Sequence, residues 1–273
     1  MIQIEQLRKR FTQGSGRKKR TVQAVDGVNF TAANGRITGL LGPNGAGKTT
    51  TLRIAAALIE PDSGTVRVDG IDVAQQPGAA LARMGVLSDA RGLYPRLTAR
   101  ENIVYYGRLH GMTAAAAAAR VDVLARTLDM APLLDRRTDG FSQGERMKTA
   151  LARALIHDPP NIVLDEPTNG LDVLATRALR EALRRLRDDE GKCIVFSTHI
   201  MQEVERLCDH VVVVAHGCTV AAGTVAELSA AAGQTDFEET FVKLAFGAEG
   251  AASAFGAEGA ATATATTALG SAA

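Results

Sequence analysis

The fold of this chain is decided by the stretch Gly42-Pro43-Asn44-Gly45-Ala46-Gly47-Lys48-Thr49-Thr50. It matches the pattern G-x-x-x-x-G-K-[S/T], and it lies between an apolar run at residues 37–41 and a segment of helical spacing that extends to residue 58. The glycines allow the backbone to wrap closely around an anion, and the start of the helix adds partial positive charge. The stretch therefore predicts a phosphate-binding loop. The alternative is a glycine-rich turn with one exposed lysine.

Two residues of this loop carry specific chemistry. The amine of Lys48 can reach the β- and γ-phosphates of a nucleotide, and the hydroxyl of Thr49 can ligate Mg²⁺. We therefore predict that residues 42–50 bind the phosphates together, that Lys48 also assists catalysis, and that Thr49 is a metal ligand.

An acidic pair follows a second apolar run. Residues 162–164 are all aliphatic, as expected of a strand buried on both faces, and Asp165 and Glu166 come directly after them. Ligands bind at the carboxyl ends of parallel strands, so both carboxylates are expected at the same edge as the loop. We predict that Asp165 holds Mg²⁺ and that Glu166 polarises the attacking water. Such a pair alone is a weak signal, and the loop upstream makes it a strong one.

The remaining pattern predicts strands that alternate with helices. Alternating apolar residues predict strands within residues 1–41, with a polar basic loop at 14–20 that is either a solvated hairpin tip or a contact for phosphate or lipid. Asp69-Gly70 predicts the turn of a hairpin over residues 64–73. Further strands are expected at 194–197 and 211–215, and helices within 98–156 and at 173–187 and 201–207. This order predicts an α/β sheet with right-handed crossovers.

Helix starts are marked by hydroxyl residues. Thr98, Ser142 and Thr224 are each followed three residues later by Glu, which is the capping-box spacing. Thr113 precedes a run of alanines at 114–119, which predicts a plain exposed helix.

Composition excludes several classes of protein. The chain has 273 residues with 46% hydrophobic and 22% charged residues, and it contains no apolar run long enough to span a bilayer. A net charge of +1 gives no field that would attract nucleic acid. Cys193, Cys208 and Cys218 have no C-x-x-C spacing and are expected to be reduced. The chain is therefore not expected to be secreted, collagenous, membrane-spanning or wholly disordered.

The last residues differ from the rest of the chain. Residues 247–273 consist almost only of Ala, Gly, Thr, Ser and Glu, and they have too little apolar bulk to form a core. We therefore expect a domain at 1–246 and a disordered tail at 247–273.

Three further motifs resemble those of one family. Residues 141–145 (Phe-Ser-Gln-Gly-Glu) resemble the signature motif of ATP-binding-cassette (ABC) ATPases, residues 169–172 (Asn-Gly-Leu-Asp) their D-loop, and residues 197–199 (Ser-Thr-His) their switch histidine. The order and spacing match from about residue 2 to residue 228. The resemblance implies a P-loop NTPase core, mainly a parallel sheet with flanking helices. It also implies an N-terminal antiparallel β subdomain and an inserted α-helical subdomain at about 90–158.

The resemblance also implies a mechanism. Two chains would form a homodimer that sandwiches two ATP molecules with Mg²⁺, and one chain's signature motif would contact the nucleotide held by the other. The residues that it adds to the site are Ser142, Gly144, Asp172, His199 and Phe11. His199 would hydrogen-bond the γ-phosphate, with Glu166 as the base. Phe11 would stack on adenine, although a core phenylalanine is the alternative. Ser142 also caps its helix, and Glu145 must fold back onto that cap to avoid the phosphates.

Two positions depart from the family pattern. Gln143 stands where the common signature has glycine, and Asp89 stands where the family usually has a glutamine. An aspartate there is a candidate Mg²⁺ ligand that cannot donate a hydrogen bond. Ser88 is the alternative counterpart of that glutamine.

The runs at 89–102 and 141–147 resemble ATPase subunits of bacterial exporters, in particular those linked to sodium efflux. This implies a peripheral protein at the cytoplasmic face of the membrane that energises a separate permease. The permease contact is expected at residues 87–95, with Leu93 and Tyr94 exposed. The alternatives are a multidrug or antibiotic exporter, a cytosolic ATPase that acts on DNA or ribosomes, and a module that binds ATP without hydrolysing it.

Overall fold

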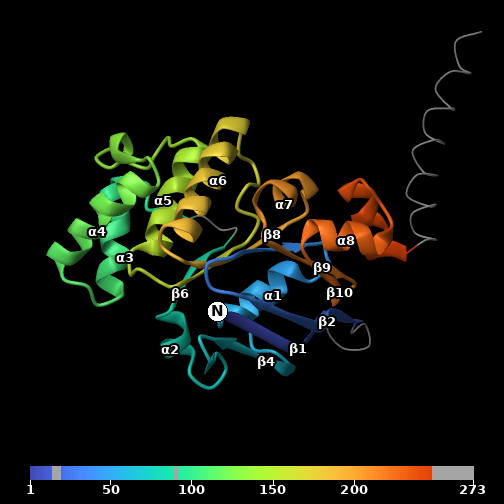
Figure 1. The fold of residues 1–273 in the computed structure, drawn as a ribbon. Helices are drawn as coiled ribbons and strands as arrows, with labels where there is room; N and C mark the ends of the chain where they lie inside the picture. The colour runs from blue at the N-terminus through green and yellow to red at the C-terminus, as the bar shows by residue number, and fades with distance from the viewer. Residues whose placement is uncertain (14–19, 89–91, 248–273) are drawn as a thin grey trace, which may run out of the picture.

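The computed structural model describes residues 1–13, 20–88 and 92–247 (Figure 1). Residues 14–19 of the predicted basic loop, Asp89 and residues 248–273 of the tail lie outside the described residues.

A six-stranded sheet forms the core of the chain, in the order β10-β9-β3-β8-β7-β6. The strands are β3 (Ile37–Leu41), β6 (Met84–Leu87), β7 (Asn161–Leu164), β8 (Cys193–Thr198), β9 (His210–Ala215) and β10 (Cys218–Gly223). All pairs are parallel except β9 with β10. Every residue of β3, β7 and β8 is buried, because these apolar runs lie in the middle of a sheet covered on both faces. The sequence pattern did not predict β10, whose residues are mostly small and weakly apolar and which lies at the sheet edge.

A second sheet is antiparallel, with the order β2-β1-β4-β5. Its strands are β1 (Ile2–Gln13), β2 (Arg20–Ala32), β4 (Ser63–Val68) and β5 (Ile71–Asp72). The predicted hairpin turn is confirmed, since β4 pairs with β5 and the turn residues Asp69 and Gly70 have φ values of 49° and 81°.

Some helices cover the parallel sheet, and others form a separate group on the left of Figure 1. They are α1 (Lys48–Ala55), α2 (Pro77–Leu81), α3 (Ala99–Leu109), α4 (Ala114–Thr127), η2 (Ala131–Leu133), α5 (Gln143–Leu155), α6 (Val173–Asp188), α7 (Met201–Leu207) and α8 (Val225–Ala232), with a further helical stretch at 237–247. The predicted helical region 98–156 is divided into three α-helices. Gly111 and Asp129 interrupt it with φ values of 80° and 49°.

The predicted helix caps are confirmed. Thr98, Ser142 and Thr224 each form a capping box, and the hydroxyl of Thr113 accepts a hydrogen bond from the amide of Ala116. Each cap satisfies backbone N–H groups that have no partner within the helix.

Two of the three buried clusters position the elements that carry the predicted site residues. One packs α3, α4, α5 and α6 against β7 and β8, and the other fills the space between the two sheets around α1. The first cluster holds the helical group against the parallel sheet, and the second holds the loop before α1 between the sheets.

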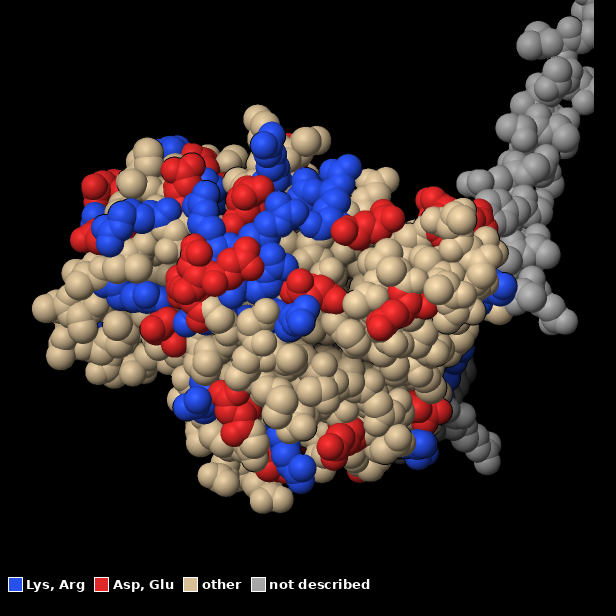
Figure 2. Space-filling view, viewed as in Figure 1, with Lys and Arg blue, Asp and Glu red and all other residues tan. Residues whose placement is uncertain are grey.

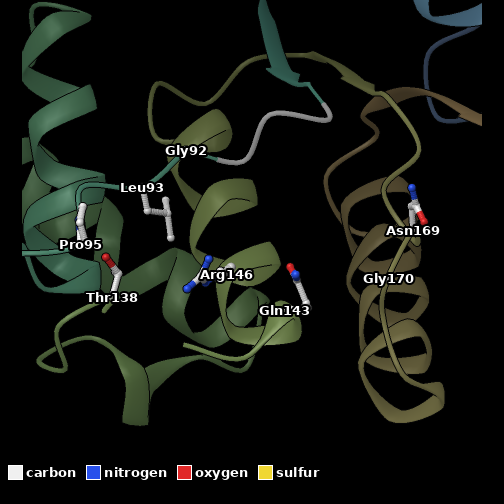
Figure 3. Close-up of a pocket in the computed structure, with 8 residues that line it drawn as sticks. All are labelled: Gly92, Leu93, Pro95, Thr138, Gln143, Arg146, Asn169 and Gly170. Carbon is white, nitrogen blue, oxygen red and sulfur yellow. The ribbon is translucent and has the colours of Figure 1, made fainter. Parts of the chain in front are cut away.

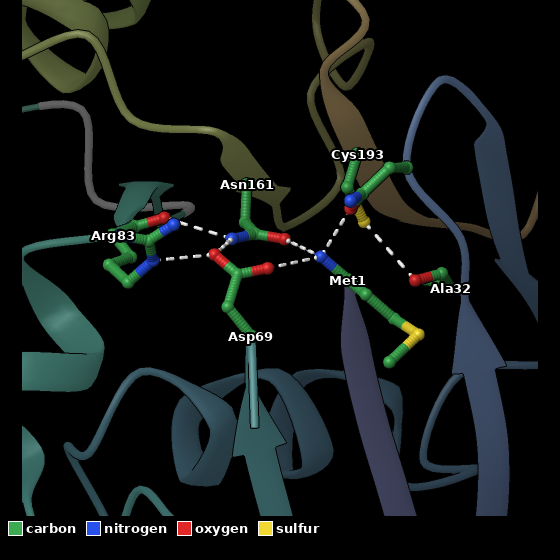
Figure 4. Close-up of polar contacts among 7 residues, drawn as sticks. Met1, Ala32, Asp69, Arg83, Asn161 and Cys193 are labelled. Atoms are coloured by element: carbon green, nitrogen blue, oxygen red, sulfur yellow. Dashed lines mark hydrogen bonds and ion pairs between the residues drawn. The ribbon is translucent and has the colours of Figure 1, made fainter. Parts of the chain in front are cut away.

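Polar contacts join the two sheets at the start of β7 (Figure 4). The carboxylate of Asp69 accepts hydrogen bonds from Arg83 Nε at 2.7 Å and from Asn161 Nδ2 at 2.9 Å. The amine of Met1 donates to Asp69 and Asn161, each at 2.6 Å. Cys193 Sγ lies 3.4 Å from the carbonyl of Ala32, so β8 is also tied to the antiparallel sheet. These contacts fix how the hairpin of one sheet meets the strands of the other.

Among the described residues, no helix is long and apolar enough to cross a membrane. Lys and Arg side chains gather over α6 and α7 in Figure 2, where α6 carries Arg177, Arg180, Arg184, Arg185 and Arg187.

Candidate active site

The predicted phosphate loop, residues 42–50, connects β3 to α1 and is packed tightly from two sides. A Cβ at Gly42 would lie 2.2 Å from the carbonyl oxygen of Val214, and one at Gly47 would lie 2.4 Å from that of Ala24. Gly47 also has a φ of 100° and is the N-cap of α1, with no side-chain cap. Helix α1 therefore begins with N–H groups that no N-cap side chain satisfies, and such a start binds anions.

Lys48 lies inside the loop. Its amine donates to the carbonyls of Gly42 at 2.7 Å and Pro43 at 3.1 Å, and only 5% of its side chain is exposed. Glu166 Oε1 lies 3.5 Å from this amine. Burial lowers the pKa of Lys48, and the negative charges of Glu166 and Asp165 partly offset that shift. A phosphate in the loop would give this desolvated cation a stronger partner than the two carbonyls.

The acidic pair lies at the end of β7, next to the loop. Asp165 Oδ1 accepts hydrogen bonds from Thr49 Oγ1 at 3.0 Å and from Ser197 Oγ at 2.7 Å. Glu166 follows with a φ of 46°, which is unusual for a residue with a side chain, and its amide donates to Ser197 Oγ at 2.9 Å. Two neighbouring strands therefore hold the two carboxylates at fixed positions.

His199 completes a continuous row of polar contacts that begins at Lys48. Its Nδ1 lies 2.9 Å from Glu166 Oε2, while the other oxygen of Glu166 faces Lys48. The imidazole is 42% exposed and the carboxylate 15% exposed. Solvent or substrate therefore reaches Glu166 from the side on which His199 lies. These residues come from the ends of β3, β7 and β8, which are adjacent in the sheet.

The signature residues lie on a different element. Ser142 is the N-cap of α5, its hydroxyl accepts from the amide of Glu145 at 3.2 Å, and its own amide donates to Glu145 Oε2 at 2.8 Å. Glu145 thus folds back onto the cap as predicted, and Arg136 lies 2.6 Å from its other oxygen. The Ser142 amide and the Arg136 charge lower the pKa of Glu145, so this carboxylate is an anion that is already neutralised.

Gly144 and Asp172 lie where α5 meets α6. A Cβ at Gly144 would be 2.9 Å from the Cβ of Ala175, so a side chain would push the two helices apart. Asp172 caps α6 by accepting from the amide of Ala175 at 2.8 Å. Ser142, Gly144 and Asp172 contact residues of α5 and α6, at the starts of these two helices.

Phe11 also stands apart from the loop. It pairs with Val22 on β2, is partly exposed, and has the amine of Lys9 at 5.8 Å from its ring centroid. It does not belong to the buried clusters of the described residues, so the alternative of a core phenylalanine is wrong.

A hollow of about 590 Å³ separates the signature helix from the D-loop (Figure 3). It is lined by Gly92, Leu93, Pro95, Thr138, Gln143, Arg146, Asn169 and Gly170. Gln143, which replaces the usual glycine, projects from the start of α5 on this side (Figure 3). Leu93 is partly buried and packs against the helical core, whereas Tyr94 is 46% exposed as predicted.

From the sequence, Ser197 had no predicted role beyond its place in the switch motif. It stands out there only as a hydroxyl residue at the end of an otherwise apolar strand, two residues before His199. Its contact with the acidic pair can be recognised only when β7 and β8 are known to be neighbours.

Comparison with known proteins shows to which family the chain is related. A family model described as "ABC transporter" matches residues 25–169. The chain is 44% identical over 229 residues to the ABC transporter ATP-binding protein NatA of Bacillus subtilis, covering 84% of this chain and 91% of that protein. It is 42% identical over 217 residues to Nod factor export ATP-binding protein I of Paraburkholderia xenovorans, covering 80% of this chain and 71% of that protein.

Solved structures of ABC transporter subunits have the same fold as this chain. The ATP-binding subunit of an ABC transporter superposes with a TM-score of 0.75 at 28% identity, over 89% of this chain and 98% of that one. A dimeric bacterial ABC transporter cassette, at 24% identity and a TM-score of 0.73, covers 82% of this chain and 98% of its own and shares the fold. With the family model across more than half of its length, the chain belongs to the ABC transporter family and is one of its ATP-binding, ATP-hydrolysing subunits.

Proposed function

We propose that this chain powers export by hydrolysing ATP as a homodimer bound to a separate membrane permease. The observation that carries this proposal is the continuous contact from Lys48 through Glu166 to His199, with Nζ–Oε1 and Nδ1–Oε2 distances of 3.5 Å and 2.9 Å. A cation for phosphate, a base for water and a titratable donor lie together at one sheet edge, as phosphoryl transfer requires.

In this proposal the phosphate loop binds the triphosphate, with Lys48 on the β- and γ-phosphates. Mg²⁺ fits between Thr49 and Asp165, because hydroxyl and carboxylate oxygens are its preferred ligands and these two lie 3.0 Å apart. Mg²⁺ held there supplies positive charge that offsets the charge on the phosphates. Asp89, the other metal ligand predicted from the sequence, lies outside the described residues.

Glu166 is proposed as the general base. Without nucleotide its carboxylate is held by Lys48 and His199. When phosphate draws the Lys48 amine away, Glu166 keeps its place beside His199 and can accept a proton from water. His199, the more exposed partner, then donates to the γ-phosphate. Phe11, partly exposed on β1, is proposed to stack on adenine.

Dimerisation follows from the separation of the signature residues from this site. Ser142 and Gly144 begin α5, and Asp172 begins α6, with no contact to Lys48 in the described part of the chain. A helix start with a hydroxyl is a site for an anion. We infer that these three residues bind the nucleotide held by a second copy, so that each protomer contributes one half of each site.

The permease is proposed to dock beside the hollow at residues 92–95, where Tyr94 is exposed. In this proposal the chain acts at the cytoplasmic face of the membrane. Sodium is the proposed cargo, supported by the resemblance to sodium-efflux ATPases and by the 44% identity to NatA. The relative named for Nod factor export supports export as the direction.

The test is purification of the tagged chain from membranes of its host, followed by identification of the multi-span protein that comes with it. We expect a permease whose reconstitution with this chain gives ATP-dependent ²²Na⁺ efflux from vesicles. Efflux of a drug instead of sodium would contradict the cargo. Full activity in the soluble fraction, with no membrane partner, would contradict the transport function itself.

A further inference from the structure

We propose that Ser197 is a positioning residue for hydrolysis, which holds the general base and the proposed metal ligand in register. This inference rests on the proposed roles of Glu166 and Asp165. Ser197 lies on β8 and is 0% exposed, so no solvent competes for its hydroxyl.

The hydroxyl makes two hydrogen bonds whose directions are determined by chemistry. Ser197 Oγ lies 2.7 Å from Asp165 Oδ1 and 2.9 Å from the amide nitrogen of Glu166. An amide can only donate and an ionised carboxylate can only accept, so the single hydroxyl proton points to Asp165. One buried atom therefore binds two consecutive residues of the acidic pair at once.

The bond to Glu166 acts on a strained backbone. Glu166 has a φ of 46°, a conformation that a residue with a side chain adopts only when its surroundings hold it there. The Ser197 hydroxyl accepts from the amide of this residue. Holding this amide keeps the Glu166 side chain between Lys48 and His199, where its two oxygens are used.

The bond to Asp165 keeps its carboxylate oriented when nucleotide binds. Asp165 Oδ1 accepts from both Thr49 and Ser197. Thr49 belongs to the phosphate loop and is expected to change partners with nucleotide, whereas Ser197 belongs to a buried strand. Ser197 is therefore the partner that persists.

Ser197 and His199 act on the acidic pair from neighbouring positions. Ser197 lies within β8, and His199 follows the last residue of that strand. The Ser197 hydroxyl contacts Asp165 at 2.7 Å, and His199 Nδ1 contacts Glu166 Oε2 at 2.9 Å. Thr198, between them, uses its hydroxyl to accept from the amide of Ile200 at 3.0 Å. The end of β8 and the residue after it therefore supply one contact to each carboxylate.

The test compares Ser197→Ala, Ser197→Cys and Ser197→Thr, with Thr240→Val as the matched control. Thr240 is also 0% exposed and hydrogen-bonded through its hydroxyl, but it lies in the helical stretch at 237–247. We expect Ser197→Ala to lower kcat by roughly 10- to 100-fold, the worth of one hydrogen bond to a charged group, with the KM for ATP unchanged. Ser197→Thr keeps the hydroxyl and should restore most of kcat. Thr240→Val should leave kcat at the wild-type value.

A second measurement separates positioning from activity. Hydrogen–deuterium exchange at the Glu166 amide should be faster in Ser197→Ala without nucleotide and unchanged in Thr240→Val. In the Glu166→Gln background, Ser197→Ala should cause a smaller loss of turnover than in the wild type, because part of its effect passes through Glu166.

Unchanged kcat in Ser197→Ala, or an effect confined to KM, would overturn the proposal. So would unchanged exchange at Glu166. If Ser197→Ala does not fold, Ser197→Cys, which matches serine in shape with a weaker hydrogen bond, is judged by the same criteria. Wild-type turnover that survives Glu166→Gln would instead refute the role of Glu166, and the two failures are therefore distinguishable.

Discussion

Two regions of this molecule carry the motifs of one reaction, and they differ in how complete they are. At the carboxyl edge of the parallel sheet, Lys48, Glu166 and His199 contact one another directly. At the start of α5, Ser142 and Glu145 contact each other, and Glu145 also contacts Arg136. The sheet edge is a site assembled from three strands of one chain, whereas the signature helix begins with a capping box formed by Ser142 and Glu145.

The difference shows what a second copy can add. A closed capping box leaves the Ser142 hydroxyl able to accept another contact only from outside its own helix. The sheet-edge site needs no partner to hold its base and cation in place. We therefore expect variants at the sheet edge to affect chemistry within a protomer, and variants at the signature helix to affect assembly around ATP.

Glu166→Gln is expected to have the largest effect. Glutamine cannot accept the proton of water, so turnover should fall by roughly 10²- to 10⁴-fold while ATP still binds. Light scattering after gel filtration with ATP and Mg²⁺ should show a stable dimer. A variant that remains monomeric with ATP bound would contradict the dimer.

Lys48→Ala should have the next largest effect. Loss of the desolvated cation should lower turnover by roughly 10²- to 10³-fold and weaken ATP binding, measured by a fluorescent nucleotide. Lys243→Ala is the matched control, since Lys243 donates to the carbonyl of Ala232 in the C-terminal helices. Equal losses in both variants would refute the phosphate role of Lys48.

Ser142→Ala tests the signature helix against an equivalent cap elsewhere. Thr224 forms the same capping box at α8, so both Ser142→Ala and Thr224→Ala should lower the free energy of unfolding by about 1 kcal/mol. Only Ser142→Ala should also weaken the ATP-dependent dimer and its turnover. If the two variants behave alike in both assays, Ser142 is a cap and nothing more.

The helical group should also be the more sensitive region to acid. His110 and His157 stack with ring centroids 3.8 Å apart, at the ends of α3 and α5. Burial and the neighbouring His110 lower the pKa of His157 from 6.5 to about 4. Between these values the unfolded chain binds the proton more readily, so stability falls as the pH drops from about 6.5 to about 4. Urea unfolding of His157→Gln across this range should show a smaller slope, and an unchanged slope would exclude His157 as its source.

Removal of the residues after 247 should have the smallest effect. Phe237, Phe241 and Ala245 in the last helical stretch are buried against β9 and α8. A chain ending at residue 247 keeps these contacts, and we propose that it is the complete ATPase domain. Its turnover and melting temperature should match those of the full chain, and a large loss of folded protein would show that the tail is structural.

The sequence by itself determined the features that are local. The phosphate loop, the apolar strands and the hydroxyl caps at Thr98, Ser142 and Thr224 depend on residues a few positions apart, and each formed where the pattern predicted. The edge strand β10 was missed because its residues are weakly apolar. The partial burial of Leu93 could not be predicted, because it depends on helices far along the chain.

Only the tertiary structure decided how the site is assembled. Asp165 and Ser197 are 32 residues apart, and their hydrogen bond exists because β7 and β8 are neighbours in register. The same register brings His199 to Glu166, and the order of β3 between β8 and β9 brings the phosphate loop to both. Motifs name the residues of a site, but the pairing of distant strands sets the distances at which they act.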